Sequence, residues 1–208
     1  MNGELGGPLI ILGGGGHAAV VAESAARAGW RVVGTAAADG GTIGDPDGAG
    51  AGEIERAAQS GAALHAAVGS AEVRERWTRR FAGARFATVV DPSALVSDTA
   101  RVGAGAFIGA GAIVQARASV GAGAIVNTRA IVEHDCAVHE FAHLSPASVL
   151  CGSVTIERGA QIGAGAVVIP GRTVGAGAVV GAGAVVVRDI PAGATAVGVP
   201  AIPRPPTR

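Results

Sequence analysis

The sequence is poor in aromatic residues and has no net charge. Its 208 residues include four Phe, two Trp and no Tyr, and 16 basic residues balance 16 acidic ones. The hydrophobic fraction of 49% overstates how apolar the chain is, because Ala and Gly dominate the composition. Because the overall charge is balanced, the composition offers no excess of basic residues for nucleic acid, and we expect no nucleic-acid partner. The length suits one large or two small domains.

Cysteine is scarce, and long apolar runs are absent near the start of the chain. Cys136 and Cys151 have neither a CxxC spacing nor that of a metal site, so we expect a reducing, cytoplasmic environment and no bound metal. The first thirty residues have no basic stretch before an apolar core, and Glu23 and Arg27 interrupt any candidate span. We therefore expect no signal peptide, no transmembrane helix and no membrane partner.

The main feature of the sequence is a repeat of six residues. An aliphatic residue returns at every sixth position from Val96 to Val186, usually with a small residue two positions earlier and often with Gly three positions earlier. Neither an α-helix nor an amphipathic strand has this period. A parallel β-helix does, because each hexad forms one short strand and one corner, and three hexads make a coil of about 18 residues. The aliphatic and small side chains would fill its interior, and Gly would permit positive φ at the corners.

A different pattern precedes Asp91. Apolar segments of strand type alternate with helical segments, which is typical of an α/β fold. We predict a Rossmann-like βαβαβ domain over residues 1–90 that binds a sugar or nucleotide, followed by an all-β parallel β-helix domain with a C-terminal tail over residues 91–208. The expected N-terminal strands are 8–12, 31–34, 63–68 and 86–90, and the expected helices are 18–28, 53–59 and 71–80, the last capped by Ser70.

The first strand ends in a glycine-rich turn. Gly14, Gly15, Gly16 and His17 would let backbone N–H groups approach a phosphate at the start of a helix. A nicotinamide enzyme needs an acidic residue at the end of the second strand. Here the chain reads Ala36-Ala37-Ala38, with Asp39 one residue later, so a nucleotide-sugar diphosphate fits this turn better than NAD.

Several other polar residues of the N-terminal domain are interpreted as structural. His65 lies within an apolar strand, which is typical of a core histidine. The arginines of the third helix are expected on a solvent-facing surface; they are Arg74, Arg76, Arg79 and Arg80.

Within the repeat, polar residues replace the corner glycines between Asn127 and Gly152. A β-helix built only for stacking would keep Gly-Ala-Gly there, as it does on both sides. Histidine is the usual general base near neutral pH, and a neighbouring carboxylate can fix its tautomer. His134, with Glu133 or Asp135 as that carboxylate, is therefore the candidate catalytic group.

These residues resemble a known family. Asn127-Thr-Arg-Ala-Ile-Val-Glu-His134-Asp135-Cys, then His143 and Cys151-Gly152, are similar to sugar acyltransferases of the bacterial sialic acid O-acetyltransferase type. That group includes N-acetyltransferases of nucleotide-linked 4-amino sugars. The glycine-rich N-terminal βαβ unit and the closing segments 187–194 and 198–201 extend the resemblance over nearly the whole chain. It implies left-handed coiling, acetyl-CoA as co-substrate, a sugar acceptor and a homotrimer with active sites between adjacent β-helices.

The resemblance also implies residue roles. His134 would be the base that takes a proton from the sugar amine or hydroxyl, with Asp135 as its acidic neighbour, and acetyl transfer would be direct, without an acyl-enzyme. Asn127 would line the acceptor pocket, and the glycine-rich turn would bind the nucleotide-sugar. The residues that would contact acetyl-CoA, at the thioester or along the pantetheine arm, are His143, Ser145, Gly152, Gly163, Ala164, Gly181 and Ala182.

Four alternatives remain open at this level. The first alternative is an O-acetyltransferase that acts on a free or lipid-carried sugar or on a specialised metabolite. It remains open because the end of the second predicted strand lacks the adjacent acidic residues of relatives that use uridine-diphosphate sugars. A metal-dependent lyase of the γ-carbonic anhydrase type is a second, since His134 and His139 stand five apart, although no His lies between His65 and His134. A non-catalytic nucleotide-sugar-binding scaffold and a covalent route through Ser145 or Cys151 complete the set.

Overall fold

The computed structural model of the chain describes residues 6–38 and 41–204. The chain divides into two compact units, Met1–Pro92 and Ser93–Arg208. The sequence predicts the boundary two residues earlier. Asp39 lies outside the described residues, so its relation to the second strand is not part of the structure. Among the residues described, no helix is both long enough and apolar enough to cross a bilayer.

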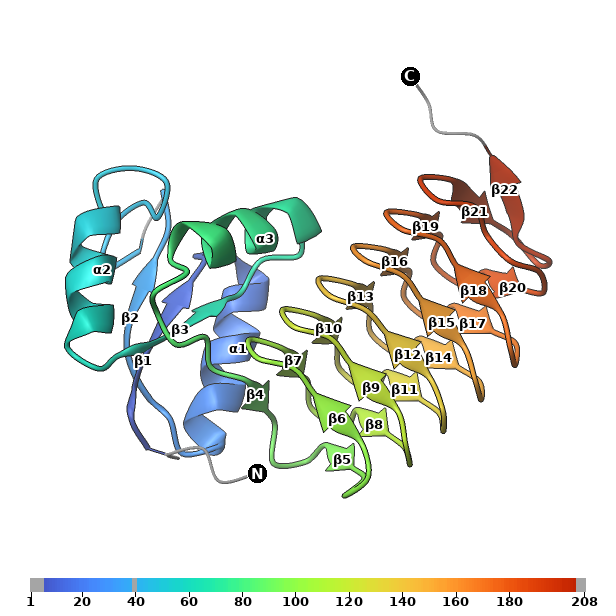
Figure 1. Cartoon of the computed structure of the whole chain (residues 1–208), viewed down its shortest axis with the longest axis horizontal. Coiled ribbons are helices and arrows are strands. Elements are labelled where there is room, and N and C mark those ends of the chain that lie inside the picture. Colours follow the sequence, from blue (N-terminus) through green and yellow to red (C-terminus); the bar gives the residue numbers. More distant parts are fainter. Residues whose placement is uncertain (1–5, 39–40, 205–208) are drawn as a thin grey trace. The chain divides into compact units, whose positions relative to one another are not determined.

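The first unit contains a three-stranded parallel sheet with strand order β2-β1-β3 and helices between the strands (Figure 1). β1 is central, which explains its continuous apolar sequence: both faces of a central parallel strand are covered. The core joins Ile10 and Leu12 of β1 to Ile54, Leu64 and Trp77. The elements are β1 (Pro8–Leu12), α1 (Gly16–Arg27), β2 (Arg31–Ala36), α2 (Ala51–Gln59), β3 (Ala63–Ala66), α3 (Ala71–Arg80) and β4 (Val89–Val90).

Local sequence signals set most of these boundaries. Ala28 is the C-cap of α1, and Gly29, which follows it, ends the helix with φ 90°. The Ser70 hydroxyl caps the start of α3 by accepting a hydrogen bond from the Val73 N–H at 3.3 Å. The predicted strand 86–90 is shorter in the structure. Phe86 forms only an isolated bridge with Leu64, and the Ala87 carbonyl bonds the His65 ring instead of a strand.

The second unit is a parallel β-helix in which every hexad forms a two-residue strand and a corner (Figure 1). Paired strands lie 18 residues apart, so that Ile131 pairs with Ile113 on one side and with Val149 on the other. The strands are β5 (Leu95–Val96), β6 (Arg101–Val102), β7 (Phe107–Ile108), β8 (Ile113–Val114), β9 (Ser119–Val120), β10 (Ile125–Val126), β11 (Ile131–Val132), β12 (Ala137–Val138), β13 (His143–Leu144), β14 (Val149–Leu150), β15 (Thr155–Ile156), β16 (Gln161–Ile162), β17 (Val167–Val168), β18 (Thr173–Val174), β19 (Val179–Val180), β20 (Val185–Val186), β21 (Thr195–Val197) and β22 (Ile202–Arg204).

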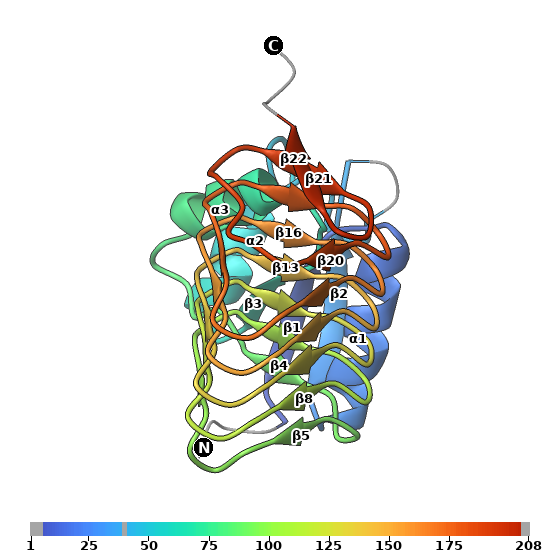
Figure 2. The ribbon, with the colours of Figure 1, turned by 90° about the vertical axis from the view of Figure 1, so that its right-hand side faces the viewer.

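The strands form three sheets, one for each face of the prism. Of the strands in the second unit, the β10 sheet contains β7, β10, β13, β16, β19, β21 and β22; the β11 sheet contains β5, β8, β11, β14, β17 and β20; and the β12 sheet contains β6, β9, β12, β15 and β18. Figure 2 looks along the stacked coils from the end that carries β22. The second residue of every strand from β7 to β20 is at most 3% exposed and forms the interior. The predicted fold class, an α/β unit followed by a parallel β-helix of hexapeptide repeats, is confirmed.

The corners have the predicted left-handed backbone. Glycines at this position have φ between 62° and 69° in the regular coils. Six residues with side chains adopt the same conformation at φ 56–61°, and all lie between residues 117 and 153: Arg117, Arg129, Asp135, Phe141, Ala147 and Ser153. Non-glycine residues rarely adopt this conformation, so the polar part of the repeat keeps the backbone of the glycine corners at an energetic cost.

Candidate functional site

His134 lies at the corner between β11 and β12. Its ring Nδ1 is 2.8 Å from Oδ2 of Asp135. An ionised carboxylate can only accept hydrogen bonds, so Nδ1 of the neutral ring holds the hydrogen and Nε2 holds the lone pair. The sequence prediction left Glu133 and Asp135 open as the carboxylate partner, and the structure places Asp135 against the ring.

Asp135 is held in turn by Arg117. The guanidinium donates from Nε to Oδ1 at 2.7 Å and from Nη2 to Oδ2 at 2.9 Å. Arg117 precedes Asp135 by 18 residues, so the two occupy the same corner of consecutive coils. The hydrogen bonds from Arg117, followed by the one from His134, lower the pKa of Asp135 below its ordinary value. Asp135 is therefore ionised throughout the physiological range.

Gly152 lies against the His134 ring. It occupies the same corner as His134, one coil later. A Cβ atom at position 152 would lie 2.7 Å from Cε1 and 2.8 Å from Nε2 of His134. Only glycine leaves room for the ring in this position, and the edge with the Nε2 lone pair therefore lies beside the backbone of Gly152. The His134 side chain is 56% exposed in the single chain.

A second group of predicted residues lies at the preceding corner, between the β10 and β11 sheets. Asn127 Oδ1 accepts a hydrogen bond from the Thr128 N–H at 2.8 Å, which directs its Nδ2 toward Nε2 of His143 at 3.4 Å. Ser145, 18 residues after Asn127, is 8% exposed. Two further glycines continue the same column at intervals of 18 residues: Gly163 and Gly181.

These two glycines also have a packing role. A Cβ at Gly163 would lie 2.5 Å from the backbone nitrogen of Ala182, and one at Gly181 would lie 2.7 Å from Cγ1 of Val197. Close stacking of the coils therefore requires glycine at both positions, whatever lies outside. Ala164 and Ala182 are exposed beside them.

The structure assembles the predicted catalytic and coenzyme residues into two groups. His134, Asp135 and Gly152 lie at one edge of the β11 sheet, whereas Asn127, His143 and the Gly163 column lie at or beyond its other edge. One complete face of the prism separates the two groups within a single chain. Among residues 6–38 and 41–204, no group of three or more His, Cys, Asp or Glu side chains could hold a metal ion.

The glycine-rich turn of the first unit is open to solvent. Gly14, Gly15 and Gly16 are exposed, no side chain caps α1, and its first turn contains no acidic residue. These features leave the positive end of the helix dipole available to an anion. Burial, and secondly the charge of Arg74, lower the pKa of His17 to about 4. His17 is therefore neutral at pH 7.

Comparisons with known proteins match both units. A model described as PglD N-terminal domain matches residues 8–81, and one described as bacterial transferase hexapeptide (six repeats) matches residues 153–188. The chain is 38% identical to a variant of GDP-perosamine N-acetyltransferase from Caulobacter crescentus, solved with CoA and GDP-perosamine, with a TM-score of 0.88 and coverage of 94% of this chain and 96% of that one. The chain belongs to the hexapeptide-repeat sugar acetyltransferases.

Other solved structures extend this comparison. The acetyltransferase domain of PglB from Neisseria gonorrhoeae, in complex with acetyl coenzyme A, is 36% identical with a TM-score of 0.84, over 95% of this chain and 98% of that one. WeeI from Acinetobacter baumannii shares the fold at 23% identity, with a TM-score of 0.83 and coverage of 95% of this chain and 100% of that one. A search of the curated proteins finds no match.

One prediction from the sequence, that Arg74 of α3 faces solvent, is wrong. Arg74 is not on a solvent-facing surface, because its side chain is 1% exposed and its Nη1 donates to the carbonyls of Val68 and Gly69 at 2.9 and 2.7 Å. Trp77 is buried on the same face of α3, one turn later, whereas Arg76 and Arg79 pair with acidic side chains at the surface. His65, in contrast, is a core histidine, 1% exposed, with Nδ1 2.8 Å from the Ala87 carbonyl oxygen.

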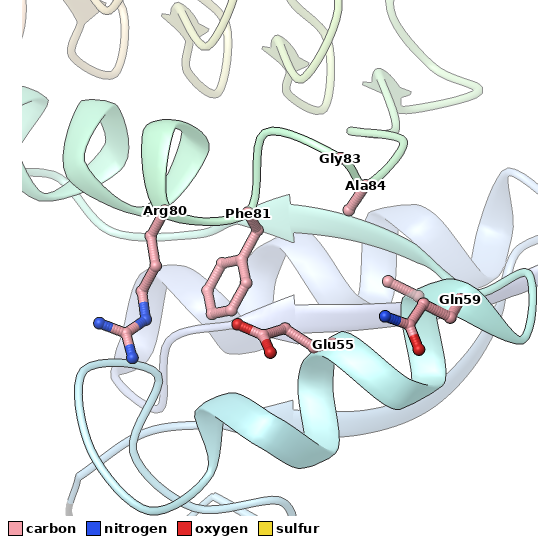
Figure 3. A pocket seen from close by; sticks show the side chains of 7 residues that line it. Glu55, Gln59, Arg80, Phe81, Gly83 and Ala84 are labelled. Carbon is pink, nitrogen blue, oxygen red and sulfur yellow. The ribbon is translucent and has the colours of Figure 1, made fainter.

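Two features were not predicted from the sequence. The partnership of Arg117 with Asp135 could have been found, because the 18-residue coil places the two side chains in one column. A pocket of about 290 Å³ in the first unit had no sequence signal (Figure 3). Glu55 and Gln59 of α2 line it opposite Arg80 and Phe81 at the end of α3, and no predicted site residue contributes to it.

Proposed function

We propose that this protein transfers the acetyl group of acetyl-CoA to an amine of a nucleotide-linked sugar, with His134 as general base. The main observation behind this proposal is the position of His134. Its Nδ1 is hydrogen-bonded to Asp135, and the side of the ring that carries Nε2 lies beside Gly152. The proposal is supported by the relative solved with CoA and GDP-perosamine, which is similar over nearly the whole length of both chains.

Each residue has a chemical role in the proposed reaction. The Nε2 lone pair of His134 accepts the proton of the sugar amine as its nitrogen attacks the thioester carbonyl, and Asp135 stabilises the imidazolium that forms. The backbone N–H at Gly152 would bond the carbonyl oxygen as negative charge develops there. The adduct then collapses and the C–S bond breaks, the CoA thiolate leaves and takes up the proton held by His134, and the neutral imidazole is restored without an acyl-enzyme.

The coenzyme would lie against the second group of residues. Asn127 and His143 would contact the acetyl end, and the small residues of the Gly163 column would leave room for the pantetheine arm. Because one face of the prism separates these residues from His134, we infer that a complete site needs His134 from one copy of the chain and the second group from a neighbouring copy.

The outer face of the β11 sheet supports such an assembly. Its six outward positions are all aliphatic and pair in register: Leu95, Ile113, Ile131, Val149, Val167 and Val185. The outward positions of the β12 sheet are mostly polar or small: Arg101, Ser119, Ala137, Thr155 and Thr173. A continuous apolar stripe is typical of an interaction surface. A cyclic homotrimer would cover it in every copy and bring the two edges together.

The glycine-rich turn supports an acceptor with a diphosphate. Its exposed backbone and the uncapped α1 are suited to phosphate, and the strand end at Ala36 and Ala37 is buried and apolar. The identity of the nucleobase, and transfer to a hydroxyl of a free sugar, are outcomes of the assay below.

The decisive experiment measures thiol release from acetyl-CoA with a panel of nucleotide-linked 4-amino sugars, the corresponding free amino sugars and sugars with hydroxyl groups only. We expect release with a nucleotide-linked amino sugar. His134→Asn should lower kcat by about 10²- to 10⁴-fold, because general-base catalysis contributes that much. Release with hydroxyl acceptors alone would replace the proposal by O-acetylation, and full activity of the His134→Asn variant would refute the assignment of the base.

A further inference from the structure

Arg117 and Asp135 form an ion pair at an unusual place in the backbone. Both have φ 61°, at a corner position that glycine occupies in the regular coils. The Arg117 N–H donates to Thr99 Oγ1 at 3.1 Å, one coil earlier, so the backbone of this corner is bonded as well as its side chain. Thr99, Arg117 and Asp135 thus occupy the same corner of three consecutive coils. Hydrogen bonds link each of them to the next, and Asp135 is bonded to the ring of His134.

Stability alone does not explain this pair. A residue with a Cβ in the left-handed region costs energy relative to glycine, and two such costs are present here. The Arg117 side chain is 65% exposed and that of Asp135 is 37% exposed. An exposed ion pair adds appreciably to folding stability only when its geometry is as favourable as a two-pronged Arg–carboxylate contact, and here the cost of the two left-handed residues opposes that gain. Strained residues that persist without a gain in stability are typical of functional sites.

The geometry of the pair constrains the catalytic carboxylate. Arg117 bonds both oxygens of Asp135, at 2.7 and 2.9 Å, and Oδ2 also bonds Nδ1 of His134 at 2.8 Å. A carboxylate gripped at both oxygens cannot rotate about its last torsion without breaking a charge-assisted bond. Arg117 thus sets the plane of the carboxylate, and the carboxylate sets the tautomer and tilt of the imidazole.

We propose that Arg117 is a positioning residue for the acetyl-transfer site. It acts through Asp135 and contacts neither substrate nor coenzyme. The inference rests on the proposed function, because it names the support of the proposed base.

Steady-state kinetics of three variants test the proposal. Arg117→Gln should lower kcat about tenfold and leave the KM for acetyl-CoA within about twofold, because orientation of the base is lost while binding is kept. Arg117→Lys should retain an intermediate kcat, since an ammonium group supplies charge without the two-pronged contact. Arg101→Gln is the matched control, because Arg101 is an exposed arginine at an outward position of β6. It should behave as the wild type. An unchanged kcat in Arg117→Gln would overturn the proposal.

A double-mutant cycle separates positioning from a merely structural role. If Arg117 acts through Asp135, adding Arg117→Gln to Asp135→Asn should change kcat by less than about twofold. A further tenfold loss in the double variant would mean that Arg117 acts by another route, and the proposal would fail.

An NMR measurement remains informative even if no acetyl transfer is found. Long-range ¹H–¹⁵N spectra of the wild type should show His134 protonated at Nδ1, and Arg117→Gln should show a mixture of the two neutral tautomers. A wild-type tautomer retained in Arg117→Gln would overturn the positioning role. Absence of transfer with the tautomer change present would overturn the proposed function alone.

Discussion

At the scale of single residues, the position of the proposed catalytic base, His134, depends on the absence of a Cβ atom at Gly152. The His134 ring occupies the space that a Cβ at position 152 would fill, and this fixes where its Nε2 lies. The backbone of Gly152 does not have positive φ, so an alanine there would be strained only by its contact with the ring. A substitution at this position therefore tests the placement of the ring with little change to the coil.

We predict that Gly152→Ala lowers kcat for acetyl transfer by about 10- to 100-fold, because displacing a catalytic group by an ångström can cost that much. The melting temperature should change little, since the ring is half exposed and can move outward. Gly83→Ala is the control, because its Cβ would meet nothing within 4 Å and its φ is not positive. Equal kcat values for Gly152→Ala and the wild type would contradict the described position of His134.

The sequence could point to His134 as a candidate catalytic residue because the regular repeat makes any replacement of its corner Gly and Ala residues easy to see. In a scaffold built from Gly and Ala, any histidine at a corner is conspicuous, and the carboxylate beside it restricts the choice of partner to two residues. Proximity in sequence could not decide between Glu133 and Asp135. The decision depends on which side chain the left-handed corner turns toward the ring, and that corner has φ 61° at Asp135.

At the scale of elements, β3 and α3 place ionisable groups inside the first unit. Burial lowers the pKa of His65 to about 4, despite the opposing effect of its hydrogen bond to the Ala87 carbonyl. Burial also lowers the pKa of Arg74 to about 10, so its charge persists near neutral pH and disfavours protonation of both histidines. Protonation of His17 or His65 would therefore lower the stability of the first unit.

The consequence is a pH dependence of stability. Between about pH 4 and pH 6.5 the unfolded chain binds protons that buried His65 rejects, so the free energy of unfolding should rise with pH in that window. From pH 7 to pH 5 we expect a loss of about 2 kcal/mol from His65, estimated from its depressed pKa.

Urea unfolding at the two pH values measures the summed loss from His17 and His65, and the difference between the wild type and a His65 variant gives the share of His65. Both tryptophans, Trp30 and Trp77, lie in the first unit, so their fluorescence follows that unit selectively. His65→Asn keeps a donor for the Ala87 carbonyl but cannot titrate, and it should show a correspondingly smaller loss. Identical pH dependence in the variant and the wild type would disprove the role of His65.

The sequence predicted α3 correctly as a helix but misplaced one of its faces. Arg74, Trp77 and Phe81 follow the spacing of one helical face, and all three are buried. An arginine on such a face indicates a polar group to be satisfied inside, here the carbonyls after β3. Composition favoured a solvated surface because buried arginines are rare, and only the tertiary contacts reveal the exception.

At the scale of the whole molecule, the period of six determines both the core and the outer surfaces. Because each strand from β5 to β20 has two residues, the first points outward and the second inward, and every third strand shares a face. The aliphatic column that fills the interior was visible in the sequence. The outward aliphatic column of the β11 sheet lies one residue earlier in every third hexad, and its continuity follows from the 18-residue coil.

The same geometry makes the division of the site between chains testable by complementation. His134→Asn removes the base at one edge of the β11 sheet, and His143→Ala removes a coenzyme contact beyond the other. Each variant alone should be strongly impaired. If a site takes one edge from each of two neighbouring copies, random mixing of the two variants in a trimer restores about one quarter of the sites.

Co-refolding the variants in equal amounts and assaying thiol release measures this fraction. Each variant refolded by itself is the control, and activity near one quarter of the wild type requires that the two edges meet across an interface. Activity that stays at the level of the single variants would mean that one chain builds the whole site, which the face between its two residue groups argues against. The aliphatic stripe along that face would then need another partner, because a continuous apolar stripe is typical of an interaction surface.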